Sequence, residues 1–262
     1  MPEPIADQLD RLADKVRSAP QVMMFTDFDG TLVPIKDRPT ECFLDPAVGR
    51  TLSALAGHER VSVGIVSGRE LVDLRARVGV DGIIYAGNHG LEIEGPGFVF
   101  REPNAVSMIN ALKKLVDNIA PVLAGFPGAW IQDKGLSASV HYRQVDPAVV
   151  PRLLEVVRHV ATPSIEAQKV VLRSGKKVME VRPAVDWHKG KAVEWLVNRM
   201  SLCTNPLLIY LGDDNTDEDV FAAWPGGITV CVGEKRNTLA NYSVSDPSEV
   251  HVFLCWLLSV LT

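Results

Sequence analysis

The chain has 262 residues, of which 47% are apolar, and its 27 Lys and Arg against 32 Asp and Glu give a formal net charge of −5. This length allows one large domain, or a core domain that carries a smaller insertion. The high apolar fraction excludes intrinsic disorder. The acidic balance argues against sequence-independent nucleic-acid binding, which needs a basic surface. We therefore expect no nucleic-acid partner.

The sequence also argues against membrane insertion and secretion. Its longest apolar stretch, residues 253–261, is far shorter than the roughly 20 residues of a membrane helix. The first residues lack the basic segment and apolar core of a signal peptide. The four cysteines are Cys42, Cys203, Cys231 and Cys255, and they form no CxxC pair. Scattered cysteines of this kind are typical of proteins in a reducing compartment. We expect a cytoplasmic protein without a membrane partner, and a monomer is favoured.

Short apolar runs alternate with amphipathic segments between residues 22 and 99. Strands are predicted at 22–25, 61–66 and 82–86. A helix is predicted after Asp45, an N-cap residue followed by proline, and another between the second and third strands. Alternation of strand and helix is typical of a doubly wound parallel sheet.

The middle of the chain follows another pattern. A helix at 106–119 precedes strands at 129–133 and 136–142, and a helix at 147–160 precedes strands at 164–172 and 177–182. The alternating pattern resumes with helix 188–200, strand 207–211, helix 217–224, strand 227–232 and a last helix from about 248. We predict an α/β fold in which a parallel core (1–94 and 186–262) carries an α+β cap (95–185) that sets substrate specificity.

Polar clusters follow several strands of the predicted core. Asp27 and Asp29 follow the first strand, Ser67 the second, and Asn88-His89 the third, while Asp213-Asp214 follows strand 207–211. Ligands of open α/β sheets bind beyond the carboxyl ends of the strands. We therefore expect these residues to form one site.

The residue types in this cluster fit phosphoryl transfer. Crowded carboxylates repel one another, and Mg²⁺ with its oxygen ligands would relieve that repulsion. Asp27 could attack phosphorus, and Asp29 could protonate the leaving oxygen and later activate water. Ser67 and Lys189 could stabilise the phosphoryl oxygens. Taken singly, these motifs are more typical of a turn, a helix cap or a solvated charge than of a catalytic site; their convergence at one sheet edge favours the functional interpretation.

Four of these motifs resemble the haloacid dehalogenase superfamily of phosphatases: residues 27–32, Ser67, Lys189 and 212–214. The resemblance implies that Asp27 is the nucleophile and Asp29 the general acid and base. It also implies Mg²⁺ held by Asp27, the backbone carbonyl of Asp29 and Asp213. Asp214 and Asp217 would be supporting acidic residues at that metal site.

Further segments resemble the trehalose-6-phosphate phosphatases of this superfamily: 65–69, 86–92, 134–137, 141–143, 180–183, 187–192 and 210–219. His188 departs from the family, in which Asp or Asn often precedes the Lys-Gly pair. The resemblance implies Mg²⁺-dependent hydrolysis of trehalose 6-phosphate to trehalose and phosphate, through a phospho-aspartate. The protein would thus be a phosphoric monoester hydrolase of trehalose biosynthesis.

One face of the predicted cap sheet is polar. Strand 136–142 places Ser139 and His141 on the same face, and strand 177–182 does so for Glu180 and Arg182. Periodicity alone fits an ordinary solvated face equally well. The resemblance favours sugar binding there, and the candidate substrate-binding residues are Asn88, His89, Glu92, Lys134, His141, Arg143, Glu180 and Arg182.

Two alternatives remain at the level of sequence. The substrate could be another sugar phosphate, such as sucrose 6-phosphate or a glucosyl- or mannosyl-glycerate phosphate. The chain could also be a catalytically silent sugar-phosphate sensor. Silent relatives would be expected to lose one of the chemical residues, whereas Asp27, Asp29, Ser67, Lys189 and Asp213 are all present. Transport chemistry is less favoured because the sequence has no membrane spans. A stand-alone capped chain also suits hydrolysis better than phosphomutase chemistry.

Overall fold

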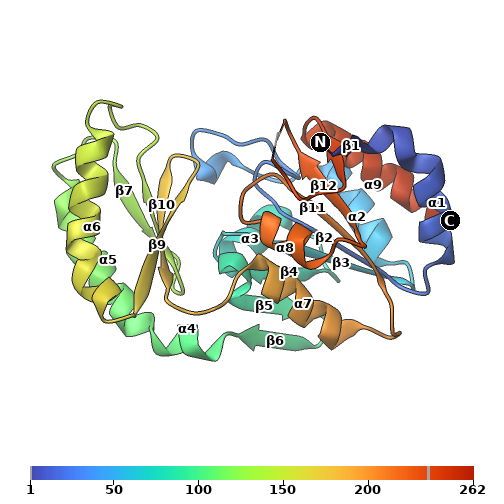
Figure 1. Cartoon of the computed structure of the whole chain (residues 1–262), viewed down its shortest axis with the longest axis horizontal. Helices are drawn as coiled ribbons and strands as arrows, with labels where there is room; N and C mark the ends of the chain where they lie inside the picture. Colours follow the sequence, from blue (N-terminus) through green and yellow to red (C-terminus); the bar gives the residue numbers. More distant parts are fainter. Residues whose placement is uncertain (1, 235–236) are drawn as a thin grey trace. The chain divides into compact units, whose positions relative to one another are not determined.

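The computed structural model describes residues 2–234 and 237–262. The chain forms two compact units: one runs up to Phe100 and resumes at Trp187, and the other spans Arg101–Asp186 (Figure 1). The inserted unit begins later than residue 95, because 92–101 form two strands, β5 and β6, that belong to the sheet of the first unit.

The first unit contains the strands β1 (Glu3–Pro4), β2 (Val22–Thr26), β3 (Val61–Val66), β4 (Ile84–Gly87), β5 (Glu92–Gly95), β6 (Phe98–Arg101), β11 (Leu207–Gly212), β12 (Ile228–Val232) and β13 (Tyr242–Val244). Its α-helices are α1 (Leu9–Ser18), α2 (Pro46–Ala56), α3 (Leu71–Val78), α7 (Lys189–Met200), α8 (Glu218–Ala223) and α9 (Pro247–Leu261). Short 3₁₀ helices lie at η1 (Ile5–Gln8), η2 (Pro39–Glu41) and η3 (Asn88–Gly90).

Within the described residues these nine strands form one sheet, in the order β1-β13-β12-β11-β2-β3-β4-β5-β6. Neighbouring strands from β1 to β4 are parallel, and β5 runs antiparallel to β4. The predicted parallel α/β core is therefore confirmed. Central strand β2 pairs with β11 on one side and β3 on the other, so the carboxyl ends of these strands meet at one edge.

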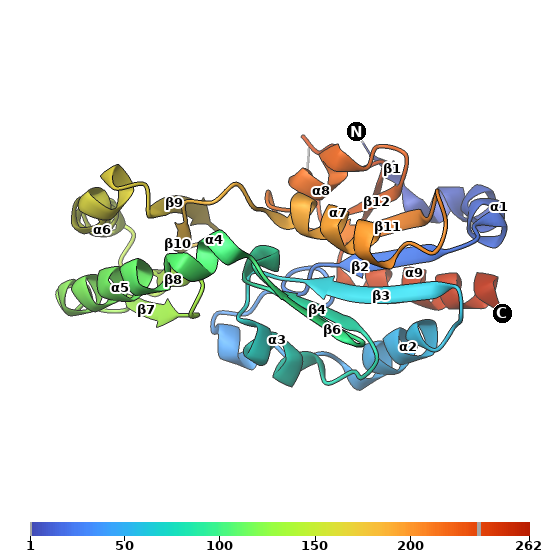
Figure 2. The same ribbon diagram turned by 90° about the horizontal axis from the view of Figure 1, so that it is seen from below.

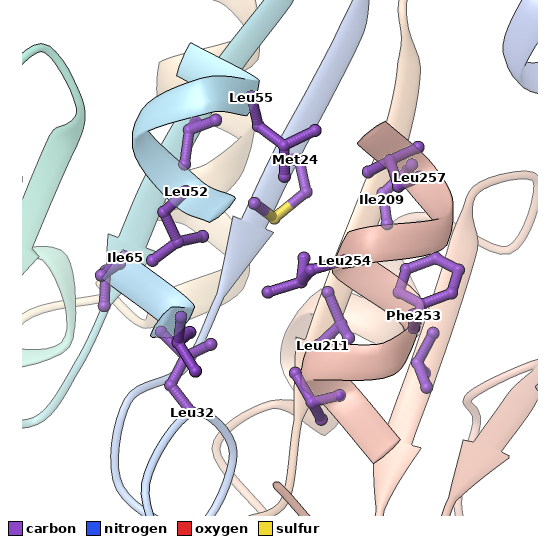
Figure 3. Close-up of a cluster of buried hydrophobic side chains, with 14 of the residues drawn as sticks. Met24, Leu32, Leu52, Leu55, Ile65, Ile209, Leu211, Phe253, Leu254 and Leu257 are labelled. Carbon is purple, nitrogen blue, oxygen red and sulfur yellow. The ribbon is translucent and has the colours of Figure 1, made fainter. Parts of the chain in front are cut away.

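Both faces of the sheet are covered by helices (Figure 2). Met24 of β2 faces a hydrophobic cluster with α1, α2, α3 and α9, whereas Met23 and Phe25 face α7 and α8. This alternation follows from the two-residue period of a strand. Figure 3 shows part of the first cluster, in which Leu52 of α2 and Leu254 of α9 are fully buried.

Helix α9 begins with a side-chain cap. The carboxylate of Asp246 accepts hydrogen bonds from the backbone N–H groups of Ser248 and Glu249, at 2.7 and 3.3 Å. Its apolar residues then pack into the core beside α1 and α2. Across residues 2–234 and 237–262, no helix has the length and apolar character needed to cross a membrane.

The second unit is an antiparallel sheet packed on helices. In the described chain its four strands run in the order β7 (Trp130–Asp133), β8 (Ala138–His141), β10 (Val178–Pro183), β9 (Val170–Gly175). Helices α4 (Pro103–Ser107), α5 (Ile109–Leu123) and α6 (Val150–Glu166) complete the unit. Apolar residues of α5 and α6 pack against one face of the sheet, which includes Val140 of β8 and Met179 and Val181 of β10.

The predicted strand at 164–172 is partly wrong. Helix α6 continues to Glu166, past Pro163, and β9 begins only at Val170. The turn between them includes Gln168, whose φ of 52° is left-handed. Buried residues such as Val157 and Ala161 hold this helix against the unit's core, and tertiary packing of this kind overrides local sequence preference.

Candidate active site

Asp27 stands directly after β2, at the carboxyl edge of the parallel sheet. Its backbone N–H donates to the carbonyl of Leu211 in the neighbouring strand, at 2.8 Å. The strand is buried on both faces, so this position removes the side chain from solvent, and Asp27 is only 5% exposed. Buried carboxylates are rare unless they are paired or bind a cation.

Lys189 provides that pairing. It opens α7, is 2% exposed, and its Nζ donates to Oδ1 of Asp27 and Oδ1 of Asp217, both at 2.8 Å. The hydroxyl of Tyr210 donates to the same Asp217 oxygen at 2.7 Å. Oδ2 of Asp217 accepts from the backbone N–H of Asp214 at 2.9 Å. A lysine surrounded in this way is a fixed positive charge, not a solvated one.

Asp213 completes the acidic group. Among the described residues, Asp27, Asp213 and Asp217 form the cluster of potential metal ligands, with one carboxylate oxygen from each lying within 4.8 Å of the others. The cluster is tightly enclosed, because a Cβ on Gly30 would lie 2.1 Å from Oδ2 of Asp213. Thr31 Oγ1 donates to Oδ1 of Asp213 at 3.5 Å.

The donor set of this cluster fits a hard divalent cation. All of its ligand atoms are carboxylate oxygens, which Mg²⁺ prefers. If all were ionised, the carboxylates of Asp27, Asp213 and Asp217 together with Lys189 would leave two negative charges in a buried site. A divalent cation would neutralise them, so the residues present fit a magnesium site.

The electrostatics of the cluster reflect its burial. Burial raises the pKa of Asp27 well above its ordinary value, the nearby Asp217 and Asp213 act in the same direction, and Lys189 opposes them. Burial alone would lower the pKa of Lys189, but the carboxylates of Asp217 and Asp27 outweigh it and the pKa is raised. Burial and Asp217 also raise the pKa of Tyr210, which keeps its hydroxyl as a donor.

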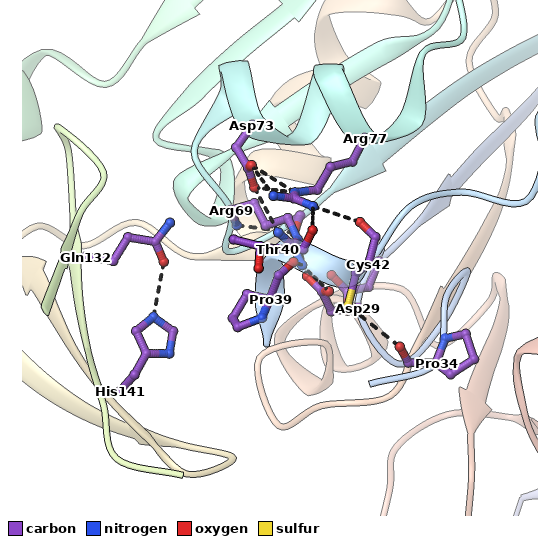
Figure 4. Close-up of polar contacts among 12 residues, drawn as sticks. Asp29, Pro34, Pro39, Thr40, Cys42, Arg69, Asp73, Arg77, Gln132 and His141 are labelled. Atoms are coloured by element: carbon purple, nitrogen blue, oxygen red, sulfur yellow. Dashed lines mark hydrogen bonds and ion pairs between the residues drawn. The ribbon is translucent and has the colours of Figure 1, made fainter. Parts of the chain in front are cut away.

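Asp29 lies two residues beyond Asp27, but its carboxylate forms an ion pair with Arg69 (Figure 4). Nε of Arg69 donates to Oδ2 of Asp29 at 2.6 Å, and Nη2 donates to Oδ1 at 2.7 Å. The side chain of Asp29 is 35% exposed, whereas that of Arg69 is 8% exposed. This pairing uses both oxygens of the carboxylate, and Asp29 is not a member of the acidic cluster.

The remaining core candidates line the ends of β3 and β4. Ser67 is buried, and its Oγ accepts from the backbone N–H of Arg69 at 3.2 Å. Asn88 and His89 take left-handed φ values of 49° and 59°. A Cβ on Gly68 would lie 2.7 Å from the ring of His89, so this turn packs tightly against the Ser67 loop.

Glu92 has a role in the fold that the sequence did not indicate. Its Oε1 accepts from the backbone N–H of Leu71, the first residue of α3, at 2.9 Å. The same oxygen accepts from Nδ2 of Asn88 at 2.8 Å. Glu92 therefore helps to cap α3 and fixes Asn88.

The cap candidates belong to the second unit and lie mostly on the polar face of its sheet. His141 stacks on Trp130 with ring centroids 4.0 Å apart, and its Nε2 lies 3.1 Å from Oε1 of Gln132 (Figure 4). Glu180 and Arg182 form an ion pair along β10. Beyond that face, Lys134 is buried in the turn after β7, and Arg143 donates from Nη2 to the carbonyl of Lys176 at 3.1 Å.

Asp217 and Arg69 make more contacts in the site than the sequence indicates. Asp217 was predicted only as a supporting acid, yet it is fully buried and bonds Lys189, Tyr210 and the backbone of the 213–214 turn. Arg69 was not a candidate at all. Asp214, by contrast, is half-buried outside the cluster, and its Oδ1 accepts from the backbone N–H of Asn215. The sequence does carry a signal for Arg69: it lies two residues after Ser67, in the segment 65–69 that resembles the family.

Comparison with known proteins places this site in a family. A family model described as trehalose-phosphatase matches residues 25–246, which include Asp27, Lys189 and Asp217. The chain belongs to the trehalose-phosphatase family. It is 34% identical over 250 residues to trehalose-phosphate phosphatase B of Arabidopsis thaliana, covering 89% of this chain and 65% of that protein.

Another relative is the trehalose-phosphate phosphatase of Mycobacterium tuberculosis, 37% identical over 245 residues, which cover 90% of this chain and 61% of that protein. The chain thus matches less than two thirds of the length of both relatives. The C-terminal domain of a C. albicans trehalose-6-phosphate phosphatase superposes with a TM-score of 0.84 over 98% of each chain. At 23% identity, that likeness shows a shared fold.

Proposed function

We propose that this protein is a Mg²⁺-dependent phosphatase that hydrolyses trehalose 6-phosphate to trehalose and phosphate through a phospho-aspartate on Asp27. The family model and the named activity of the relatives support the reaction and the substrate. The buried carboxylates around Lys189 support the mechanism. We also propose a cytoplasmic location, which the four free cysteines favour; a monomeric state stays a prediction.

In the first half-reaction, a carboxylate oxygen of Asp27 attacks phosphorus. The bond between phosphorus and the sugar oxygen breaks, and Asp29 donates a proton to that oxygen so that a neutral alcohol leaves. Lys189 contacts Asp27 at 2.8 Å, where it orients the carboxylate and offsets charge on the phosphoryl oxygens. Ser67 supplies a hydroxyl at the end of the neighbouring strand.

In the second half-reaction, Asp29 takes a proton from a water molecule that attacks phosphorus. The bond to Asp27 breaks, phosphate is released and the free carboxylate is restored. Asp27, Asp213 and Asp217 would hold Mg²⁺, with the Asp29 carbonyl and Asp214 as further candidates, and the bound ion would supply Lewis-acid polarisation of the phosphoryl oxygens.

The second unit would recognise the sugar. Sugar hydroxyls need paired donors and acceptors, which His141, Glu180 and Arg182 offer on one sheet face beside the ring of Trp130. Lys134 and Arg143 are further candidates, while Asn88 and His89 would act from the core. Glu92 is then a supporting residue, since its Oε1 already binds Asn88 and Leu71.

The single observation that carries the proposal is Asp27 held by a buried lysine within an acidic cluster. A phosphate-release screen with purified protein tests it, using trehalose 6-phosphate, sucrose 6-phosphate, glucose 6-phosphate and glucosyl- and mannosyl-glycerate phosphates, each with MgCl₂ or EDTA. We expect trehalose 6-phosphate to turn over fastest, EDTA to abolish release, and folded Asp27→Asn protein to be inactive. A different preferred ester would revise the substrate; no turnover of any ester would favour the silent sensor.

A further inference from the structure

Arg69 contacts several groups that converge on its buried guanidinium (Figure 4). Besides the two bonds to Asp29, its Nη1 donates to Oδ2 of Asp73 at 2.8 Å, and its Nη2 also donates to the carbonyl of Pro39 at 2.9 Å. The guanidinium carbon lies 5.4 Å from the ring centre of Phe28, which is fully buried. Planar guanidinium groups bind carboxylates bidentately in this fixed geometry.

A second arginine anchors this arrangement from behind. Arg77 lies one helical turn beyond Asp73, and its Nε donates to both carboxylate oxygens of Asp73 at 2.8 Å. Its Nη1 donates at 3.0 Å to the carbonyls of Thr40 and Cys42. The hydrogen bonds from Arg77 and Arg69 outweigh the effect of burial and lower the pKa of Asp73, which favours a charged anchor.

Arg69 has anchors that do not depend on Asp29. If Asp29 turned away, Arg69 would keep its bonds to Asp73 and to the carbonyl of Pro39. Its side chain is 8% exposed, against 35% for Asp29. A general acid must come within roughly 2.6–3.2 Å of the oxygen that it protonates. Both oxygens of the Asp29 carboxylate are bonded to the guanidinium, so one of them must lose that bond before it can carry a proton to the ester oxygen.

We propose that Arg69 is a positioning residue for Asp29: it holds the carboxylate in a defined waiting position, from which one oxygen is released to reach the ester oxygen. This inference rests on the proposed function and adds a residue to it. The released oxygen takes a proton from solvent water and passes it to the departing sugar, and the remaining bond to Arg69 keeps the carboxylate within reach. In the second half-reaction Asp29 takes a proton from the attacking water; after phosphate leaves, it returns that proton to solvent and the bidentate pair re-forms.

The dependence of rate on the leaving group tests this role. Trehalose 6-phosphate releases a poorly stabilised alkoxide that needs a proton, whereas 4-nitrophenyl phosphate releases a stable anion that does not. We expect Arg69→Gln and Arg69→Lys to lower kcat/KM for the sugar ester roughly 100-fold, within the range of general-acid catalysis. For 4-nitrophenyl phosphate we expect a loss of less than about tenfold. Lysine should not rescue, because it cannot pair bidentately.

A double-mutant cycle adds a second readout. If Arg69 acts through Asp29, adding Arg69→Gln to Asp29→Asn should cause almost no further loss, since coupled residues are non-additive. Arg75→Gln is the matched control: Arg75 is an exposed arginine on α3, pairs with half-buried Glu94 and contacts neither Asp29 nor Asp73. It should leave both rates near wild type.

Equal losses on both esters, or additive losses in the double mutant, would overturn the positioning role. Arg69 would then have only a structural role, linking residues 39–42 to α3. Thermal unfolding identifies variants that do not fold, and Asp73→Asn then gives the same comparison by loosening the anchor. Wild-type turnover of 4-nitrophenyl phosphate without turnover of trehalose 6-phosphate would contradict the proposed substrate alone. The positioning role would then be tested with phenyl against 4-nitrophenyl phosphate.

Discussion

The substitution Lys189→Met removes the cation that contacts both Asp27 and Asp217. These side chains are 2%, 7% and 0% exposed, and both ion pairs measure 2.8 Å. Removing one partner of a buried pair leaves uncompensated charge and costs about 3–5 kcal/mol. At about 2–4 °C per kcal/mol for a domain of this size, the melting temperature should fall by roughly 6–20 °C in EDTA.

Addition of MgCl₂ should reverse part of this loss. A divalent cation whose free concentration is 100 times its dissociation constant stabilises the folded state by about 2.7 kcal/mol. Without Lys189, the cluster carries one more negative charge, which attracts the cation more strongly. Differential scanning fluorimetry with EDTA and with MgCl₂ measures both effects. Lys113→Met, on an exposed face of α5, is the matched control and should melt within about 1–2 °C of wild type. A Lys189→Met protein as stable as wild type in EDTA would refute the reasoning.

Three further predictions concern the site, the network and the cap. Gly30→Ala should lower turnover roughly 10²-fold, because its Cβ would lie 2.1 Å from the carboxylate of Asp213 and displace this proposed metal ligand. Asp73→Asn should remove a pH-dependent part of the stability. The lowered folded-state pKa of Asp73 stabilises wild type above the unfolded pKa of about 3.9, and this is lost as pH falls through the folded pKa, so urea unfolding curves should converge in acid. Glu180→Gln should raise KM for trehalose 6-phosphate about tenfold, through loss of a charged hydrogen bond, and leave 4-nitrophenyl phosphate hydrolysis unchanged.

Each of these three variants has a control or an outcome that would contradict its prediction. Gly79→Ala also has a positive φ, 63°, but its Cβ would meet nothing within 4 Å, so it should reduce stability and not turnover; equal activity losses at both glycines would contradict the clash. For Asp73, a stability difference that stays constant with pH would rule out the linkage. Exposed Glu166→Gln controls for the cap, and a parallel loss on both esters would argue against sugar contact by Glu180.

Most of the core could be predicted because local signals agreed there with the tertiary fold. Buried β3 occupies Val61–Val66 as predicted, and Asp45 caps α2 through the N–H of Ala47 at 2.7 Å. The last two strands of the sheet, β5 and β6, are not predicted by the sequence, because each has only four residues and one face of the edge strand β6 is exposed. Short strands of this kind depend on sheet pairing and give little periodic signal.

Some residues of the candidate site could be predicted from the sequence, and others could not. Asp27 and Asp213 could be placed because strand ends determine their location. The importance of Asp217 and Arg69 could not be predicted, since it comes from long-range contacts: Lys189 lies 28 residues from Asp217, and Asp29 lies 40 residues from Arg69. A single sequence carries no record of such pairs.

Trapping of the phosphorylated enzyme tests the central claim most directly. Wild-type protein mixed with trehalose 6-phosphate and MgCl₂, quenched in acid within the first turnover and digested, should yield a peptide in which Asp27 carries one phosphoryl group by mass spectrometry. Asp27→Asn protein treated identically should yield none. Rapid phosphate release by wild type with no phosphoryl group on Asp27, or with the group on another residue, would contradict the account.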